Sequence, residues 1–167
     1  RYPCATQVIP KDLIDKKETY RLTFYAKAIT GSPVGGVAVE LGGGYIDSSD
    51  NFKTFSPQKN SQERAIGFNA GNTFVDISLL SKPNGDISDD TIDSIWRKFQ
   101  FDFTVPESVN IDNGIKIRLG NIGVNDTAIG YDNVSLSKKV TVSQNNESLS
   151  FAKTTAFLDN KGIKDLV

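Results

Sequence analysis

The chain has 167 residues, of which 38% are apolar, so it is long enough to bury one hydrophobic core and too short for two domains of ordinary size. Nineteen Lys and Arg residues against twenty Asp and Glu residues leave a formal net charge of −1, and no run of five like charges is present. This charge pattern argues against nucleic-acid binding and against an anionic-membrane footprint. The sequence contains no His, which excludes Ser-His-Asp and Cys-His hydrolases and zinc or iron sites built on histidine.

Three further observations narrow the classes of function. No apolar run approaches the roughly 20 residues that span a bilayer, so we expect no membrane insertion. A glycosidase needs two carboxylates roughly 5 to 10 Å apart across a cleft, and no acidic pair stands in a recognisable signature, so we expect no enzymatic activity. The single cysteine, Cys4, cannot form an internal disulfide and has no His partner, so we predict that it is a small buried hydrophobic residue.

Apolar and polar residues alternate along most of the chain, which is typical of strands with one face on a core. In chain order, the alternation predicts strands over residues 19–28, 37–41, 73–79, 97–105, 115–119, 128–137 and 139–142. Only residues 88–95 and 151–158 have a spacing that allows a short helix. Many short strands separated by turn-forming residues, without crossover helices, predict an all-β antiparallel sandwich.

Two stretches depart from this alternation. Residues 42–71 are rich in Gly, Ser and Asn with scattered aromatic residues, and a polar stretch of that length either carries function or contains irregular strands. The tail, residues 148–167, contains apolar residues that a purely disordered linker would lack. We predict that part of the tail is ordered and packs against the sandwich. The alternative is a linker cut just before a following domain.

Three blocks of sequence resemble a known family. They are residues 13–28 (LIDKKETYRLTFYAKA), Trp96 with residues 101–106 (FDFTVP), and residues 128–136 (AIGYDNVSL). In this order they are similar to the carbohydrate-binding modules of the galactose-binding-like jelly-roll type that are appended to xylanases, glucanases and other polysaccharide-degrading enzymes. The resemblance covers roughly residues 5–137. It implies a jelly-roll β-sandwich over residues 1–147 that binds a polysaccharide or oligosaccharide without catalysis, in an extracellular or cell-surface protein with other domains in the same polypeptide.

One part of the family pattern is absent. The family opens with an Asn-Gly-Asp-Phe-Glu-like strand, and nothing of that kind stands in this sequence. A sandwich without one edge strand exposes unpaired backbone groups, so we expect the tail to replace that strand or to cover the edge that it would occupy. An alternative function, from a different class, is a structural or adhesive sandwich domain that presents other domains and binds no sugar.

A sugar site on a sandwich needs an exposed aromatic ring and a few fixed polar groups. Alternation along residues 19–28 places Arg21 and Tyr25 on the face that points away from the core, and Glu40 joins them if the two strands are neighbours. The charged members of this set can instead form ordinary cross-strand ion pairs around an exposed tyrosine.

Two more aromatic residues are candidates for the same role. Trp96 begins the strand that contains Phe99 and faces away from it by parity, so it either packs at the edge of the core or offers a ring to a sugar. Tyr45, in the Gly-rich stretch, either builds a platform at the end of the sandwich or pins that stretch to the body. We therefore predict carbohydrate contacts at Arg21, Tyr25, Glu40, Tyr45 and Trp96.

The resemblance also implies a structural calcium ion at Asp132 and Asn133. Calcium takes six to eight oxygen ligands, which carboxylates, amides and backbone carbonyls supply. The family's partner carboxylate belongs to the absent opening strand. Asp47, Asp50 and Asn51 are further oxygen donors that are close in sequence, although such residues are also common in ordinary loops.

Overall fold

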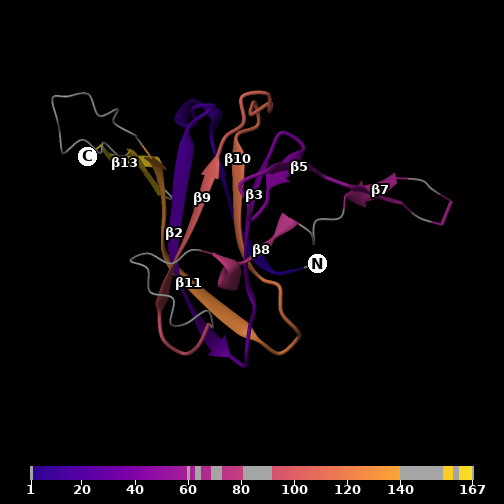
Figure 1. Ribbon diagram of the computed structural model, residues 1–167. Coiled ribbons are helices and arrows are strands. Elements are labelled where there is room, and N and C mark those ends of the chain that lie inside the picture. Colours follow the sequence, from indigo (N-terminus) through magenta and orange to yellow (C-terminus); the bar gives the residue numbers. More distant parts are fainter. Residues whose placement is uncertain are drawn as a thin grey trace.

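The computed structural model describes residues 2–59, 61–62, 65–68, 73–80, 92–139, 156–159 and 162–166. These residues form two antiparallel sheets around a single core, and a separate two-stranded hairpin (Figure 1). All pairings between the described strands are antiparallel. The prediction of an all-β antiparallel sandwich is confirmed.

The strands divide between the sheets in a way that their order along the chain does not suggest. Sheet A has the order β1-β10-β3-β4-β5, with β8 also paired to β3, and sheet B has the order β13-β12-β11-β2-β9. Sheet A consists of β1 (Cys4–Ile9), β3 (Gly35–Leu41), β4 (Gly44–Ile46), β5 (Phe52–Thr54), β8 (Val75–Asp76) and β10 (Ile115–Asn121). Sheet B consists of β2 (Thr19–Thr30), β9 (Arg97–Thr104), β11 (Ala128–Lys139), β12 (Ala156–Asp159) and β13 (Gly162–Leu166). The hairpin consists of β6 (Pro57–Lys59) and β7 (Ala65–Phe68).

Sheet B is built on the alternation of β2 and β9. Leu22 lies opposite Phe101 and Phe24 lies opposite Phe99, and all four side chains are buried. The rings of Phe24 and Phe99 stack with their centroids 5.8 Å apart. Aromatic cross-strand pairs stabilise a sheet beyond the area that they bury, so this pairing fixes the register between the two strands. It also directs Tyr25 and its neighbours of the same parity to the outer face of the sheet.

Sheet A is covered on both faces around its central strand. Every residue of β3 is buried, those that point into the core as well as those that point away from it. A Cβ at Gly36 would stand 3.0 Å from the ring of Phe74, so the glycine lets the segment before β8 approach the strand closely. The outer face of sheet A therefore offers less exposed surface at its centre than the outer face of sheet B.

In the described part of the Gly-rich stretch 42–71, four short strands are present, β4 to β7, in agreement with the prediction of irregular strands there. Gly42 and Gly43 have φ values of +55° and +77°, which suit the two-residue turn between β3 and β4. At Gly44 a Cβ would collide with the carbonyl oxygen of Lys53, so β5 lies too close for any other residue. Alternation could not locate these strands because three-residue strands contain too few positions.

Two local predictions need correction. Residues 73–79 form a strand only at Val75–Asp76, and a short 3-10 helix follows at Ile77–Leu79, where the carboxylate of Asp76 accepts from the backbone N–H of Ser78. The proposed helix 151–158 is wrong over its described part, because residues 156–158 belong to β12. Of the proposed helix 88–95 only residues 92–95 are described, and they are not helical.

The prediction that Cys4 is buried is wrong. Cys4 is exposed, with its thiol 3.7 Å from the hydroxyl of Thr6. The reason is its place in the fold. It begins β1, the edge strand of sheet A, whose residues are exposed except toward the C-terminal end.

The chain returns to sheet B after β11. The backbone of β12 pairs with β11 at Leu136 and Ser137, and β13 pairs with β12. Of the predicted strand 139–142 only Lys139 is described, and it ends β11; the domain boundary at residues 147 and 148 also lies outside the described residues. Within the described parts of the chain, no helix has the length and apolar character needed to cross a membrane.

Candidate functional site

The outer face of sheet B carries two groups of polar and aromatic side chains. Toward the start of β2, charged residues pair with one another across the strands. Toward its end, aromatic rings lie beside lysine ammonium groups. The first group contains Arg21 and the second contains Tyr25 and Trp96, so the structure places three of the five predicted sugar-contacting residues on one face of one sheet.

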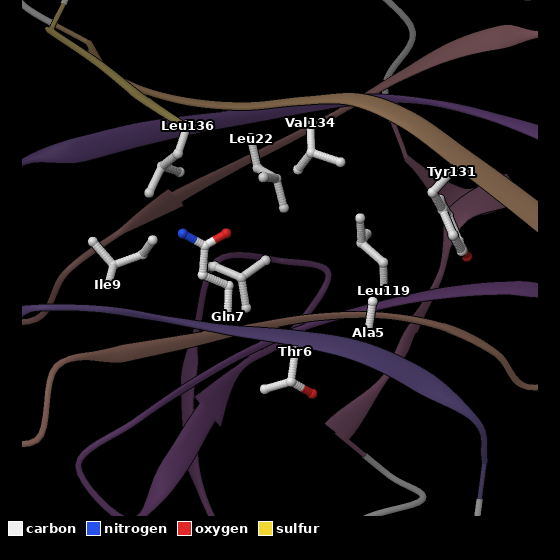
Figure 2. A pocket seen from close by; sticks show the side chains of 10 residues that line it. Ala5, Thr6, Gln7, Ile9, Leu22, Leu119, Tyr131, Val134 and Leu136 are labelled. Atoms are coloured by element: carbon white, nitrogen blue, oxygen red, sulfur yellow. The ribbon is translucent and has the colours of Figure 1, made fainter. Parts of the chain in front are cut away.

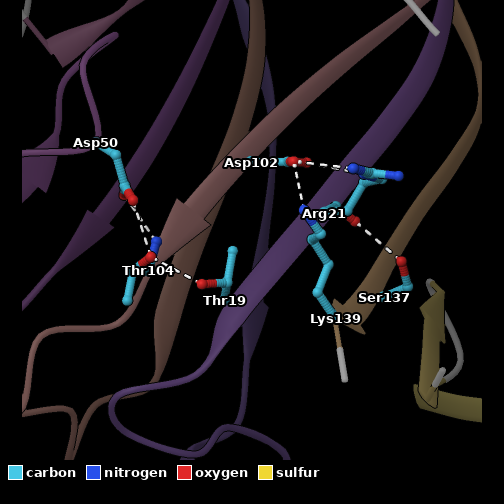
Figure 3. A network of polar contacts seen from close by, with 7 residues as sticks. All are labelled: Thr19, Arg21, Asp50, Asp102, Thr104, Ser137 and Lys139. Carbon is cyan, nitrogen blue, oxygen red and sulfur yellow. Dashed lines mark hydrogen bonds and ion pairs between the residues drawn. The ribbon is translucent and has the colours of Figure 1, made fainter. Parts of the chain in front are cut away.

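Arg21 is held in a network of polar contacts (Figure 3). Its guanidinium donates to both carboxylate oxygens of Asp102, the residue opposite it on β9, at 2.9 and 3.0 Å. The ammonium of Lys139 lies 3.3 Å from the same carboxylate. Burial by itself would raise the pKa of Asp102, but the hydrogen bond and charge of Arg21, together with Lys139, outweigh it and lower the pKa. This pair is the cross-strand ion pair that the sequence offered as the alternative to a sugar contact.

Tyr25 and Trp96 form a different arrangement. Trp96 immediately precedes β9, one step beyond the pair of Arg97 with Ala26, and its ring lies 5.0 Å from the Nζ of Lys27. Tyr25 lies opposite Lys98, whose Nζ is 6.0 Å from the tyrosine ring. Trp96 is 41% exposed, so it is not a core residue. Both rings thus face outward, each with a lysine next to it.

Gly130 of β11 completes this surface. It lies opposite Lys27 across the ladder, and a Cβ in its place would stand 3.2 Å from Cη2 of Trp96. The indole therefore reaches from the start of β9 across β2 to β11. The missing side chain leaves the room that this position of the indole needs. We call Tyr25, Lys27, Trp96, Lys98 and Gly130 the outer platform.

Glu40 and Tyr45 lie in the other sheet. The condition for joining Glu40 to Arg21 and Tyr25 is not met, because β2 and β3 are consecutive in sequence but belong to different sheets. Glu40 is 9% exposed and its carboxylate lies 3.2 Å from Nε of Arg118. Tyr45 lies opposite Glu40 on β4, and its ring stacks on Phe55 with centroids 6.2 Å apart.

A cleft of about 590 Å³ lies beside Glu40 and Phe55. Its other lining residues come from the turn between β3 and β4 and from the segment that leads into β10. Amide and carboxylate groups of Asn110, Asp112 and Asn113 are among them. The cleft is a second place where a sugar can meet polar groups next to an aromatic ring, but its carboxylate at Glu40 is already engaged by Arg118.

A further cleft of about 520 Å³ opens between the two sheets, where β1 and β10 face β2 and β11 (Figure 2). Its lining is mostly apolar, with Leu22, Leu119 and Leu136 directed into it. The hydroxyl of Tyr131 donates to the carbonyl oxygen of Gly120 at 2.6 Å, and burial raises the pKa of this tyrosine. An apolar lining of this kind does not suit a polyhydroxylated ligand, so we do not place the sugar there.

The predicted calcium residues lie on β11. Both Asp132 and Asn133 are exposed, and the carboxylate of Asp132 accepts from the backbone N–H of Asn133 at 2.8 Å. Asn133 has a φ of +50°, which marks an irregularity in the ladder with β2. Among the described residues, no group of three acidic or thiol side chains converges to hold a metal ion. The structural calcium ion at Asp132 and Asn133 stays a prediction.

The two acidic residues in the loop after β4, Asp47 and Asp50, have structural partners. The carboxylate of Asp47 accepts from the backbone N–H groups of Ser49 and Asn51, both at 2.9 Å. Asp50 accepts from the backbone N–H and the hydroxyl of Thr104 at 2.7 and 2.8 Å (Figure 3). These oxygens close a turn and tie the loop after β4 to the end of β9, which is the ordinary loop role that the sequence left open.

Lys27 and Lys98 are the charged members of the outer platform, and the sequence did not select either of them as a ligand. Their parity on alternating strands would have placed them on the outer face, as it placed Tyr25. Alternation does not contain the register between strands, and only the register brings Lys27 beside Trp96 and Lys98 beside Tyr25.

In comparisons with known proteins, no protein-family model, no curated protein and no solved structure matches this chain.

Proposed function

We propose that this protein binds a carbohydrate, without catalysis, on the outer platform of sheet B. One observation carries the proposal: two aromatic rings, Tyr25 and Trp96, face outward at the same end of one sheet. Aromatic rings on a flat surface pack against the C–H face of a sugar ring, and neighbouring polar groups bind its hydroxyls. Lys27, Lys98 and Asp132 are polar groups of this kind within the same part of the sheet.

The wider assignment follows from the resemblance noted in the sequence. We infer a jelly-roll sandwich of the galactose-binding-like type that serves as a carbohydrate-binding module of an extracellular or cell-surface protein. The antiparallel two-sheet architecture supports this inference. A structural calcium ion at Asp132 belongs to the same inference.

The chain contains a single tryptophan, which makes the experiment direct. A panel of plant, algal, microbial and host polysaccharides is titrated while the fluorescence of Trp96 is followed, with retardation in polysaccharide-containing native gels as an independent readout. We expect a saturable change in emission with at least one polysaccharide. A chain that binds nothing on the panel would favour a structural or adhesive domain instead.

Variants then locate the site. Tyr25→Ala is expected to weaken binding by about 1–3 kcal/mol, the scale for loss of a buried aromatic contact, while the circular dichroism of the fold is unchanged. Tyr45→Ala, in the other sheet, is the matched control. The opposite result, with normal affinity in Tyr25→Ala and weaker binding in Tyr45→Ala, moves the site to the cleft beside Phe55.

A further inference from the structure

We propose that the outer platform selects sugars that carry an anionic group, a carboxylate or a sulfate, over neutral sugars of the same backbone. This inference rests on the proposed function, since it names the class of carbohydrate that the same site takes. It depends on the two lysines of the platform, Lys27 and Lys98, and on what they contact.

The charged groups on the outer face of sheet B fall into two kinds. Arg21 and Lys139 both contact the carboxylate of Asp102. Lys27 and Lys98 instead contact aromatic rings. No carboxylate of the described residues lies within ion-pair distance of either ammonium. These two positive charges are thus available to an anionic ligand without the loss of an existing ion pair.

One carboxylate belongs to the same part of the sheet. Asp132 lies opposite Tyr25 across the ladder with β11, while Lys98 lies opposite Tyr25 on the other side, on β9. One oxygen of Asp132 accepts from the backbone N–H of Asn133. Among the described residues, the ladder positions around the two rings thus hold two ammonium groups and one carboxylate, a local excess of positive charge in a chain whose formal net charge is −1.

The contact of Lys27 with the indole favours anionic sugars for a second reason. An ammonium over an aromatic face is attracted to the ring, so a sugar that stacks on the same face of Trp96 must displace Lys27 from it. A neutral sugar offers the displaced ammonium only hydroxyl groups. A carboxylate or sulfate offers it a charged hydrogen bond, which is the stronger interaction. The lost cation–π contact is thus compensated only when the sugar is anionic.

The overall charge of the protein separates this selectivity from general polyanion binding. A chain with a net charge of −1 does not attract polyanions through its total field. The preference must come from the two platform lysines themselves, so removing a lysine elsewhere must leave it intact. Lys53 on β5 of sheet A is such a lysine, exposed and in the other sheet.

The test compares matched polymers. Polygalacturonic acid is compared with its carboxyl-reduced form, and dextran sulfate with dextran, by affinity gel electrophoresis and by Trp96 fluorescence. We expect at least one anionic polymer to bind about 10-fold more tightly than its neutral counterpart, and to lose about 10-fold in affinity in Lys27→Gln or Lys98→Gln but not in Lys53→Gln. The two polymer pairs distinguish a carboxylate from a sulfate as the preferred group.

Each other outcome has a defined meaning. Equal binding of neutral and anionic polymers, with loss of both in Trp96→Ala, overturns the anionic preference and leaves the sugar site in place. An equal loss in Lys53→Gln also overturns it, because the attraction would then be general. Binding of none of these polymers, nor of any other polysaccharide on the panel, removes the proposed function itself.

Discussion

Trp96 lies against Gly130, although Trp96 immediately precedes β9 and Gly130 belongs to β11, and these two strands flank β2 on opposite sides. A Cβ at position 130 would stand 3.2 Å from Cη2 of the indole and equally close to the side chain of Ile29. The absence of a side chain on β11 therefore determines how close to the sheet the indole can lie. If the indole is the surface on which a sugar stacks, Gly130 is a positioning residue for it.

Gly130→Val is expected to push the indole away from the sheet. Valine has a high preference for strands, so the fold is expected to persist. The emission of Trp96 should move to longer wavelength as the ring gains contact with water, and affinity for the polysaccharide should fall with it. Gly130→Ala, which adds only the Cβ, serves as the graded control and should give a smaller shift. Unchanged emission in the valine variant would show that the indole does not rest on this position.

The contact of Asp50 with Thr104 predicts an effect on stability. The carboxylate of Asp50 accepts two hydrogen bonds from Thr104. The backbone of Asp50 has a φ of +60°, a conformation that asparagine also tolerates. Asp50→Asn keeps the backbone and one acceptor oxygen but replaces the other oxygen with an NH2 donor, so one of the two hydrogen bonds from Thr104 is no longer accepted and we expect a loss of about 1 kcal/mol in the free energy of unfolding. Urea denaturation measures it. Glu107→Gln, at an exposed ion pair with Lys17, is the control and should change stability by less than about 0.5 kcal/mol.

The ion pair of Arg21 with Asp102 predicts how stability varies with pH. The pKa of Asp102 is lowered in the folded protein, so its contribution is present above the pKa of the unfolded state, near 3.9, and is lost as the pH falls through the lower folded value. Asp102→Asn should therefore lower the free energy of unfolding by about 1 kcal/mol at pH 7. The difference between wild type and variant should shrink below about pH 4. A difference that is constant from pH 7 to pH 3 would contradict this account.

The sequence predicted where the strands of this protein lie along the chain better than it predicted which strands pair with one another. Alternation in residues 19–28 correctly placed Tyr25 on the outer face, because parity is a property of one strand alone. The grouping of Glu40 with Arg21 failed, because it required β2 and β3 to lie in one sheet. Which strands pair depends on the packing of the whole chain, which local periodicity does not contain.

The same limit explains the contacts that the sequence missed. Lys27 reaches Trp96 only because β2 and β9 pair in one particular register over residues about 70 positions apart. Cys4 was misjudged for a related reason. Its residue type favours burial, but the residue begins an edge strand, and position in the sheet outweighed residue type.

The calcium prediction has a thermal test. An ion that binds only the folded state stabilises it by RT ln(1 + [L]/Kd), which is about 2.7 kcal/mol at 100 times the Kd. Chelation should then lower the melting temperature by several degrees, and Asp132→Asn should remove the response to added calcium. Asp112→Asn, at an exposed carboxylate in the segment before β10, is the control. A melting temperature that changes neither with chelator nor with added calcium would exclude a structural calcium ion.

The last prediction concerns the tail. β12 pairs with β11 at Leu136 and Ser137, so it continues sheet B beyond β11. Without β12, these residues of β11 would present unpaired N–H and C=O groups at a sheet edge, where another chain can pair. Deleting residues 148–167 is therefore expected to lower the melting temperature and to promote aggregation, as measured by calorimetry and light scattering. Deleting only residues 162–167 removes β13 and leaves β12 in place, so its effect should be smaller. If the chain without residues 148–167 keeps its melting temperature and its solubility, the tail has no structural role and the prediction is wrong.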